Sequence, residues 1–334
     1  MHLSKNYNAP NFSRVYIEKG VVDHPNTRKI LSKIKPKHSI IIDDYAQVFN
    51  RNNQNYMMQK NAVQCILAEK KFHFYYDGSP YCEDFEQEKF YYCSPVLNCL
   101  YNCHYCYLKA LHPSAHCVIF VNNDDLICSV KEDLLQDGQP VYLALSYDSD
   151  LLALEGITHF IEAWFPLLRA NPHLTIEVKT KANTFPFAQV PDNLIWAWSL
   201  LPQTLIDYYE PRTPSLAARI QAIRQAQRGG ARVRLSFEPL LPFPNLVSHY
   251  QEMVSLLAQY LDFNQIRDIN IGGFRISQKQ YKKFVKTDPN NPVLVHPTIL
   301  KENTHTFSED LIQSKVLKSL LTSYFPEEKI RIFS

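Results

Sequence analysis

The 334-residue sequence lacks any apolar run of the roughly 18 residues that a membrane span requires. Its first ten residues, MHLSKNYNAP, also lack the apolar core of a secretory signal peptide. We therefore expect a cytoplasmic protein with no membrane partner. The sequence contains no low-complexity segment and no repeat of roughly 20–50 residues, which excludes a repeat architecture.

A strong net charge is also missing, because 35 Lys and Arg against 33 Asp and Glu leave only +2. Such a balance neither requires nor excludes a nucleic-acid partner, so any polyanion site must come from a local patch. Two basic clusters could neutralise phosphates. Their members are Arg212, Arg219, Arg224, Arg228, Arg232 and Arg234 in one cluster and Lys279, Lys282, Lys283 and Lys286 in the other.

The chain has eight cysteines, which in a cytosolic protein indicate a metal or a catalytic site before disulfides. Cys65 and Cys117 lie within apolar runs, so we expect them to be small buried core residues. Short, regular spacing is found only in the segment CLYNCHYCYL, at Cys99, Cys103 and Cys106.

Three closely spaced thiols are compatible with two kinds of metal site. A tetrahedral zinc ion would need a fourth ligand, to be found among His104, His112, His116 and Cys93. His104 lies between two of the cysteines, where it can hardly reach the same ion. A cubane iron–sulfur cluster explains the group better, because three thiolates leave one iron open for a substrate or cofactor.

From about residue 96 onward, short β-rich runs alternate with helical patterns, which indicates βαβ units and a parallel sheet, either doubly wound or a barrel. The expected strands are residues 117–122, 141–147, 174–181, 194–200, 233–241 and 266–274. A helix is expected over 155–170 and another over 215–229, with Ser215 as N-cap and Gly229 at its end. About six units are present, fewer than the eight of a complete barrel.

Polar residues gather at the carboxyl ends of these strands, the edge at which parallel α/β proteins bind ligands. They are Ser146, Tyr147, Asp148, Ser149, Asp150, Lys179, Lys181, Ser199 and Glu238. Their recurrence along successive strands predicts a shared site.

The spacing C-x3-C-x2-C, with an aromatic residue before the last cysteine, resembles the signature of radical S-adenosylmethionine enzymes. The cysteine segment with CVIFVN, the upstream QKNAVQCILAEKK and the downstream YYEPRTPSLAARIQAIRQAQRGGARVRLSFEPLL resemble, more narrowly, the spore photoproduct lyase family. The resemblance implies a partial (β/α)6 TIM-like barrel with an N-terminal α/β extension. It divides the chain into an extension (1–90), the radical enzyme barrel (91–275) and a C-terminal segment that closes the barrel (276–334).

The same resemblance assigns residues and partners. Cys99, Cys103 and Cys106 become ligands of a [4Fe-4S] cluster, and the candidate catalytic residues are Tyr105, Tyr107 and Tyr147. S-adenosylmethionine would be bound by Ser149 and Asp150 near its methionyl group, by Lys181 at its carboxylate and by Ser199 near its ribose. The implied reaction is the splitting of a UV-induced thymine dimer in damaged DNA, with an electron donor such as flavodoxin or ferredoxin.

Tyr147 stands where the family carries a cysteine that supplies a hydrogen atom to the product radical. A phenol can also donate hydrogen, but its O–H bond is stronger than a thiol S–H bond. The chain could therefore act on a different substrate within the same lineage. A non-enzymatic iron–sulfur or zinc protein that binds nucleic acid is the alternative from another functional class.

Overall fold

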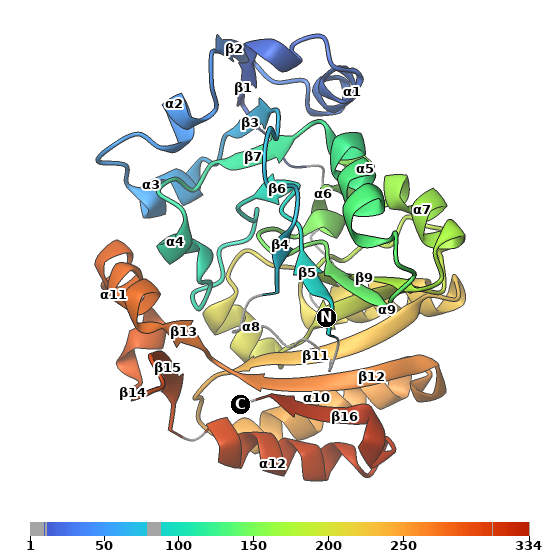
Figure 1. Cartoon of the computed structure of the whole chain (residues 1–334). Coiled ribbons are helices and arrows are strands. Elements are labelled where there is room, and N and C mark those ends of the chain that lie inside the picture. Colours follow the sequence, from blue (N-terminus) through green and yellow to red (C-terminus); the bar gives the residue numbers. More distant parts are fainter. Residues whose placement is uncertain (1–9, 11, 79–87, 309, 334) are drawn as a thin grey trace. The chain divides into compact units, whose positions relative to one another are not determined.

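The computed structural model describes residue 10 and residues 12–78, 88–308 and 310–333, so Cys82 lies outside the described residues. These residues form two compact units, and Figure 1 labels their helices and strands. The N-terminal unit comprises residues 10–100 and Leu111–Lys179. The C-terminal unit comprises Tyr101–Ala110 and residues 180–333.

The N-terminal unit contains a sheet with the strand order β2-β1-β3-β7-β6. Its strands are β1 (Arg14–Glu18), β2 (His38–Ile42), β3 (Cys65–Ala68), β6 (Val96–Leu97) and β7 (Cys117–Phe120). The first four in the order run parallel, and β6 is antiparallel to β7. Cys65 and Cys117 are register partners and are fully buried, which confirms the prediction that both are core residues. Every residue of β3 and β7 is buried, as expected of strands covered on both faces.

A second group of strands in this unit has the order β9-β8-β5-β4. It consists of β4 (Tyr76–Asp77), β5 (Phe90–Tyr92), β8 (Val141–Ala144) and β9 (Leu174–Thr180). Strands β5, β8 and β9 run parallel, and β4 is antiparallel to β5. The helices of the unit are α1 (Pro25–Ile34), α2 (Ala46–Phe49), α3 (Tyr56–Asn61), α5 (Asn123–Leu134), α6 (Leu151–Thr158) and α7 (Phe165–Ala170), with 3-10 turns η1 (Lys19–Val21) and η2 (Glu162–Trp164).

The single helix expected over 155–170 is wrong, because the chain turns between α6 and η2. His159 ends α6 in the left-handed conformation, with φ of 55°. The buried carboxylate of Glu155 then accepts the N–H groups of Ile161 and Glu162, each at 3.0 Å, and so caps the next segment. The apolar residues of the segment are nevertheless buried, namely Ile157, Phe160, Ile161, Trp164, Leu167 and Leu168.

The C-terminal unit is built on four parallel strands in the order β16-β12-β11-β10. They are β10 (Leu194–Ser199), β11 (Arg232–Leu240), β12 (Ile266–Gly273) and β16 (Ile330–Phe333). The helices are α4 (Leu108–Leu111), α8 (Gln203–Tyr209), α9 (Leu216–Arg228), α10 (Leu246–Tyr260), α11 (Gln278–Thr287) and α12 (Asp310–Leu321), with η3 (Phe263–Gln265), η4 (Pro292–Val295) and η5 (Glu327–Lys329). As predicted, Ser215 caps α9 by accepting the N–H of Ala218, and Gly229 ends it.

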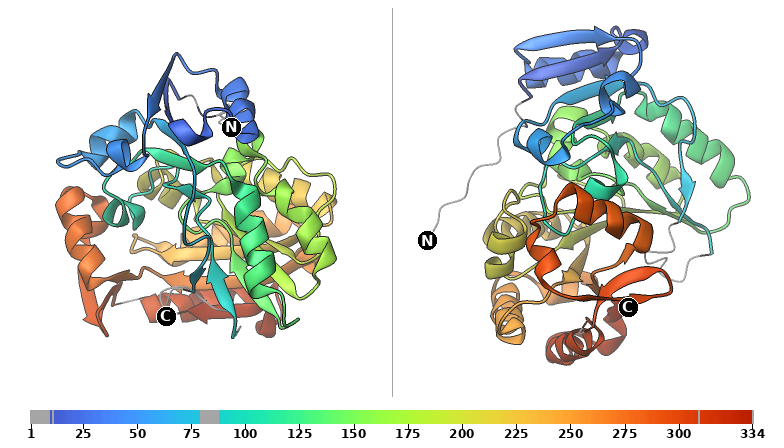
Figure 2. Two further views of the ribbon diagram at one scale, coloured as in Figure 1. Left: turned by 45° about the horizontal axis from the view of Figure 1, so that its top comes forward. Right: turned by 90° about the vertical axis from the view of Figure 1, so that its left-hand side faces the viewer.

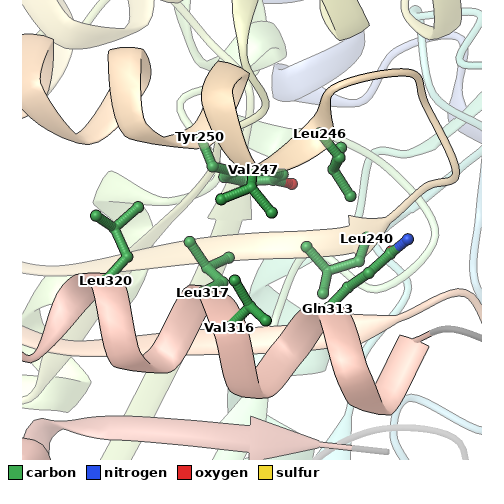
Figure 3. Close-up of a pocket in the computed structure, with 8 residues that line it drawn as sticks. All are labelled: Leu240, Leu246, Val247, Tyr250, Gln313, Val316, Leu317 and Leu320. Carbon is green, nitrogen blue, oxygen red and sulfur yellow. The ribbon is translucent and has the colours of Figure 1, made fainter.

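Helices α10 and α12 pack against each other, and α12 also contacts β11 and β12. Leu240 of β11 and apolar side chains of both helices line a small cavity of about 20 Å³ between these elements (Figure 3). That volume is close to the space of a single water molecule, and Val247 and Val316 in its lining are 43% and 40% exposed, so it is a small recess open to the surface.

A small antiparallel sheet, β13-β15-β14, belongs to the same unit and lies beside α11 (Figure 2). Its strands are β13 (Ile276–Ser277), β14 (Thr298–Lys301) and β15 (Thr304–Phe307). Tyr281 of α11 stacks on His305 of β15 with 3.9 Å between ring centroids, which joins the helix to the sheet.

All six strands predicted from the sequence are present, as β7, β8, β9, β10, β11 and β12. The six strands do not all pair in the order of the sequence. Strand β7 pairs with β3 and β6, and the strand beside β8 at that position is β5. In the described part of the chain no single helix is long and apolar enough to cross a membrane. Only Leu151–Thr158 and Glu162–Ala170 reach such a composition together, across an 85° bend.

Candidate active site

Tyr101–Ala110, called the cysteine loop, carries Cys103 and Cys106 in the C-terminal unit. The N–H of Cys106 donates to the carbonyl of Cys103 at 3.2 Å, so the backbone turns tightly between the two residues. Cys103 is buried and Cys106 is half-buried, and neither forms a disulfide. The turn therefore keeps two of the predicted cluster ligands close together.

The backbone of His104, between these cysteines, is held on both sides. Its N–H donates to the carbonyl of Tyr209 at 2.7 Å. Its carbonyl accepts the ammonium of Lys109 at 3.0 Å and the amide of Asn291 at 2.8 Å. Lys109 is in turn paired with Asp288 at 2.9 Å, with both side chains largely buried. The cysteine loop is thus fixed to the segment after α11 by buried, charge-assisted hydrogen bonds.

Tyr105 points from the cysteine loop to a buried acid. Its hydroxyl donates to Oε1 of Glu210, which is 1% exposed. Oε2 of Glu210 accepts the guanidinium of Arg219 and, at 3.1 Å, the hydroxyl of Thr213. Burial alone would raise the pKa of Glu210, but Arg219, Lys181 and the hydrogen bond from Tyr105 together lower it below its usual range. Glu210 is therefore an anion at neutral pH.

Lys181 and Ser199 lie near this carboxylate. The ammonium of Lys181 is 3.9 Å from Oε1 of Glu210 and 5.7 Å from the centroid of the Tyr105 ring. The carbonyl of Ser199, at the end of β10, accepts Nη1 of Arg219 at 2.9 Å. The C-terminal unit thus brings together three of the predicted site residues.

Cys99 lies in the N-terminal unit, where its carbonyl accepts the buried ammonium of Lys60 at 2.6 Å. The preceding residue, Asn98, has φ of 65°, a conformation that asparagine tolerates better than most residues. Its amide donates to the carbonyls of Ser114 and His116, which fixes the turn. The convergence of Cys99, Cys103 and Cys106 on one cluster stays a prediction from their spacing.

Polar residues follow β8 as predicted. Ser146 links β8 to β9 through hydrogen bonds to both backbone groups of Lys179, at 2.9 and 2.7 Å. Asp150 caps α6 by accepting the N–H of Ala153 at 3.1 Å. The hydroxyl of Ser149 is buried and has no hydrogen-bond partner among the described residues. A buried hydroxyl in this position is suited to a bound ligand that supplies the missing partner.

Tyr147 lies in a stack of aromatic rings in the same unit. Its ring lies 4.1 Å, centroid to centroid, from that of Tyr92, with 28° between the planes. Tyr92 stacks on Tyr76 at 5.1 Å, and the ammonium of Lys70 lies 5.3 Å from the centroid of the Tyr76 ring. The packing fixes the ring of Tyr147, whatever its hydroxyl contributes.

Two of the candidate fourth zinc ligands, Cys93 and His116, have environments that do not favour metal binding. Cys93 is fully buried, and burial raises the pKa of its thiol. His116 uses Nδ1 to accept the N–H of Gln64 at 3.2 Å. The ring of His112 packs against Phe49 and, because burial lowers its pKa to about 4, is neutral at pH 7 and chemically able to bind a metal. His104, the fourth candidate, has its backbone fixed within the cysteine loop.

The arginine cluster predicted to neutralise phosphates is only partly available, because Arg219 and Arg234 are fully buried and paired with Glu210 and Asp268. Arg212, Arg228 and Arg232 are exposed. The lysine cluster is exposed on α11 throughout, at Lys279, Lys282, Lys283 and Lys286.

Sequence reasoning missed Glu210 and Arg219 as members of the site. A signal was present, because Arg219 stands among Leu216, Ile220 and Ile223 on the apolar stripe of α9. A charged residue in such a stripe must be buried with a partner.

Comparisons with known proteins give a consistent result. Residues 10–290 match the sequence model of a family described as spore photoproduct lyase. A spore photoproduct lyase from Geobacillus sp. is 22% identical over 193 residues, so the match spans only about half of each protein, 56% of this chain and 56% of that relative.

Two solved structures have the same fold. One is a spore photoproduct lyase variant with bound AdoMet and dinucleoside spore photoproduct, with a TM-score of 0.82, 14% identity, and 97% of this chain and 98% of that chain covered. Another is a spore photoproduct lyase complexed with dinucleoside spore photoproduct, with a TM-score of 0.80, 13% identity and the same coverage. The mixed α/β fold with parallel strands predicted from the sequence is confirmed.

Proposed function

The chain belongs to the spore photoproduct lyase family, and from that membership we propose that it is a radical S-adenosylmethionine enzyme that repairs a UV-induced thymine dimer in DNA. The observation that carries the proposal is the triad Cys99, Cys103 and Cys106 at C-x3-C-x2-C spacing, within the matched region. We divide the chain functionally into an N-terminal extension (1–90), the barrel (91–275) and a closing C-terminal segment (276–334).

The residues present fit the two groups that this reaction needs. Cys99, Cys103 and Cys106 would hold a [4Fe-4S] cluster, since thiolates favour iron–sulfur clusters. The buried hydroxyl of Ser149 and the ammonium of Lys181 match the polar groups of S-adenosylmethionine. When bound, the cluster and S-adenosylmethionine supply the 5′-deoxyadenosyl radical that removes a hydrogen atom from the lesion.

The chain's own side chains do the remaining work. Lys181 would bind the cofactor's carboxylate, Ser149 and Asp150 its methionyl end, and Ser199 its ribose. Tyr147, held against Tyr92, would give a hydrogen atom to the product radical. Tyr105 and Tyr107 flank Cys106, so their rings would shield the cluster from water.

Damaged DNA would be the macromolecular partner. The solved relatives bind a dinucleoside spore photoproduct, and the four exposed lysines of α11 can neutralise phosphates. A lesion in a duplex would have to be extruded to reach the site, which costs least where pairing is already damaged. A one-electron donor such as flavodoxin or ferredoxin would reduce the cluster.

A second candidate function follows from Tyr147. Because this residue replaces the family's cysteine, an enzyme of the same lineage with a different substrate is the alternative. Assaying the reduced protein on photoproducts other than the thymine dimer distinguishes the two.

The test of the cofactor assignment is anaerobic reconstitution of the wild-type protein and of Cys103→Ala. We expect the variant to lose both the iron–sulfur spectrum and 5′-deoxyadenosine formation, because a cubane cluster needs one thiolate for each ligated iron. Cys128→Ala, an exposed cysteine on α5, is the matched control and should retain both. Unchanged iron content in Cys103→Ala, or a spectrally featureless zinc protein in the wild type, would refute the assignment.

A further inference from the structure

Glu210 collects more partners than an isolated ion pair needs. Its carboxylate is contacted by Tyr105, Thr213, Arg219 and Lys181, which come from four different segments of the C-terminal unit. A buried ion pair is weak evidence of a stabilising role, because the cost of removing two charges from water offsets their attraction. The identity of the partners is more informative than the pair itself.

Arg219 fixes the carboxylate from one side. Besides its bond to Glu210, it donates to the carbonyl of Pro214 at 3.0 Å and to that of Ser199 at 2.9 Å. The guanidinium is planar and fully buried, so these contacts determine its orientation. Glu210 is therefore held in a fixed position relative to the end of β10.

Tyr105 and Lys181 approach the other side, and both face the same oxygen, Oε1. The hydroxyl of Tyr105 is hydrogen-bonded to it, whereas the ammonium of Lys181 lies at 3.9 Å, beyond hydrogen-bond distance. Lys181 is thus attracted by the carboxylate without being bound tightly by it.

We infer that Glu210 is a positioning residue that couples the cysteine loop to the cofactor's carboxylate, with the Tyr105 hydroxyl occupying Oε1 and thereby keeping Lys181 directed at its ligand. The inference rests on the proposed function, since it takes Lys181 as a ligand of S-adenosylmethionine. It adds Glu210 and Arg219 to the site and gives the Tyr105 hydroxyl a specific role.

The arrangement has a consequence for binding. Without the Tyr105 hydroxyl, Oε1 has an open acceptor site, and the ammonium of Lys181 lies 3.9 Å from it. The ammonium would then move to Glu210 and form a buried, charge-assisted bond, so that a ligand carboxylate must compete for it. The loss of the Tyr105 hydroxyl would therefore weaken cofactor binding indirectly, through the displacement of Lys181.

The test is the affinity of the reconstituted holoenzyme for S-adenosylmethionine, measured by equilibrium dialysis under anaerobic conditions. We expect Tyr105→Phe to weaken binding by roughly five- to tenfold, which is within the typical net contribution of one hydrogen bond. Tyr209→Phe is the matched control, because its hydroxyl donates to the carbonyl of Pro242 at 2.8 Å and not to Glu210. The control should bind S-adenosylmethionine as the wild type does.

A double-variant cycle separates this mechanism from general damage to the site. Lys181→Ala should weaken binding by itself, and adding Tyr105→Phe to it should change the affinity by less than about twofold, because the coupling runs through Lys181. Equal iron content and equal cluster EPR spectra in all variants confirm that the cluster is intact. Additive losses in the cycle, or equal affinity of Tyr105→Phe and wild type, would overturn the inference alone.

Failure of the proposed function has a different outcome. A wild-type protein that carries the cluster but does not bind S-adenosylmethionine would reject both the proposed function and the inference drawn from it. Glu210→Gln is not used for the primary test, because it leaves the buried charge of Arg219 unpaired and is expected to destabilise the fold.

Discussion

Tyr147, which the resemblance aligns with a cysteine of the family, has a well-defined environment. Its ring is stacked on Tyr92 at 4.1 Å, so replacing the hydroxyl alone should leave the ring in place. The position can therefore be probed chemically without altering its packing. Two roles are open to it, a hydrogen donor to the product radical or a wall that confines that radical.

We expect the donor role. Tyr147→Phe should still cleave S-adenosylmethionine but accumulate abnormal adducts in place of thymine, because the product radical loses its source of hydrogen. Tyr147→Cys should shift the products back toward clean repair, because a thiol gives up its hydrogen more readily than a phenol. Chromatography of the products from anaerobic turnover distinguishes the variants.

Tyr92→Phe is the control for that experiment, since it retains the stacked ring and removes a neighbouring hydroxyl. It should give the same products as the wild type. Equal, clean thymine yields from Tyr147→Phe and the wild type would establish the wall role instead.

At the scale of single residues, the sequence predicted as candidate site residues the ones whose type and spacing are unusual. The three cysteines and Lys181 could be proposed as site residues because their side chains stand out at a strand end or in a short motif. Glu210 was not identified as a site residue, because its role depends on contacts with Tyr105 and Arg219 that only the fold creates. The same holds for Asn291, which reaches His104 across 187 residues of sequence.

The bounds of secondary-structure elements were predicted well where all residues of the element are buried. Strand β10 is buried along its whole length and was predicted within one residue at its C-terminal end. The strand β3 was read only as an apolar run, since four residues carry little periodic signal. The break between α6 and η2 could not be predicted, because the capping role of Glu155 depends on the turn that it stabilises.

Strands β11 and β12 are joined by a buried ion pair that allows a prediction about stability. Arg234 and Asp268 are register partners with bonds of 2.5 and 2.9 Å. Arg234→Met should lower the free energy of unfolding, by at most about 3–5 kcal/mol, because it removes the buried partner of Asp268 and leaves that carboxylate only the partly exposed Arg267. Urea denaturation of the anaerobic protein measures the change.

The double variant Arg234→Met/Asp268→Leu is the companion measurement. Replacing both charges by apolar side chains of similar size should recover most of the lost stability, since the remaining charge, that of Arg267, is 29% exposed and can be solvated by water. A double variant as unstable as Arg234→Met would show that the pair contributes through something other than its charges.

For the whole molecule, pH dependence of stability follows from two partly buried histidines. Burial, with a smaller contribution from Lys60, lowers the pKa of His112 from 6.5 to about 4, and burial lowers that of His116 to about 4 as well. Between pH 6.5 and 4 the unfolded chain therefore binds more protons than the folded one, so stability rises with pH across this window. Above it, both histidines are neutral in both states.

Replacing His112 by Phe should flatten the dependence of the unfolding free energy on pH between 6.5 and 4, because the ring can still pack on Phe49 but no longer titrates. Urea midpoints measured at several pH values across the window test this. A slope equal to that of the wild type would mean that His112 is protonated in the folded protein.

The sequence predicted the fold class of the whole molecule but only part of its strand order. Alternation of strands and helices indicated parallel strands, and the solved relatives confirm that fold with a TM-score of 0.82. Which strand pairs with which depends on contacts distant in sequence, such as β3 with β7, and local patterns carry no such information.

Repair of an isolated lesion tests the account most directly. The anaerobically reconstituted and reduced protein is incubated with S-adenosylmethionine and dinucleoside spore photoproduct, with Cys103→Ala as the blank. The account predicts recovery of thymine nucleosides from the photoproduct in the wild-type reaction and none in the blank. Intact photoproduct after cleavage of S-adenosylmethionine by the wild-type protein would contradict it.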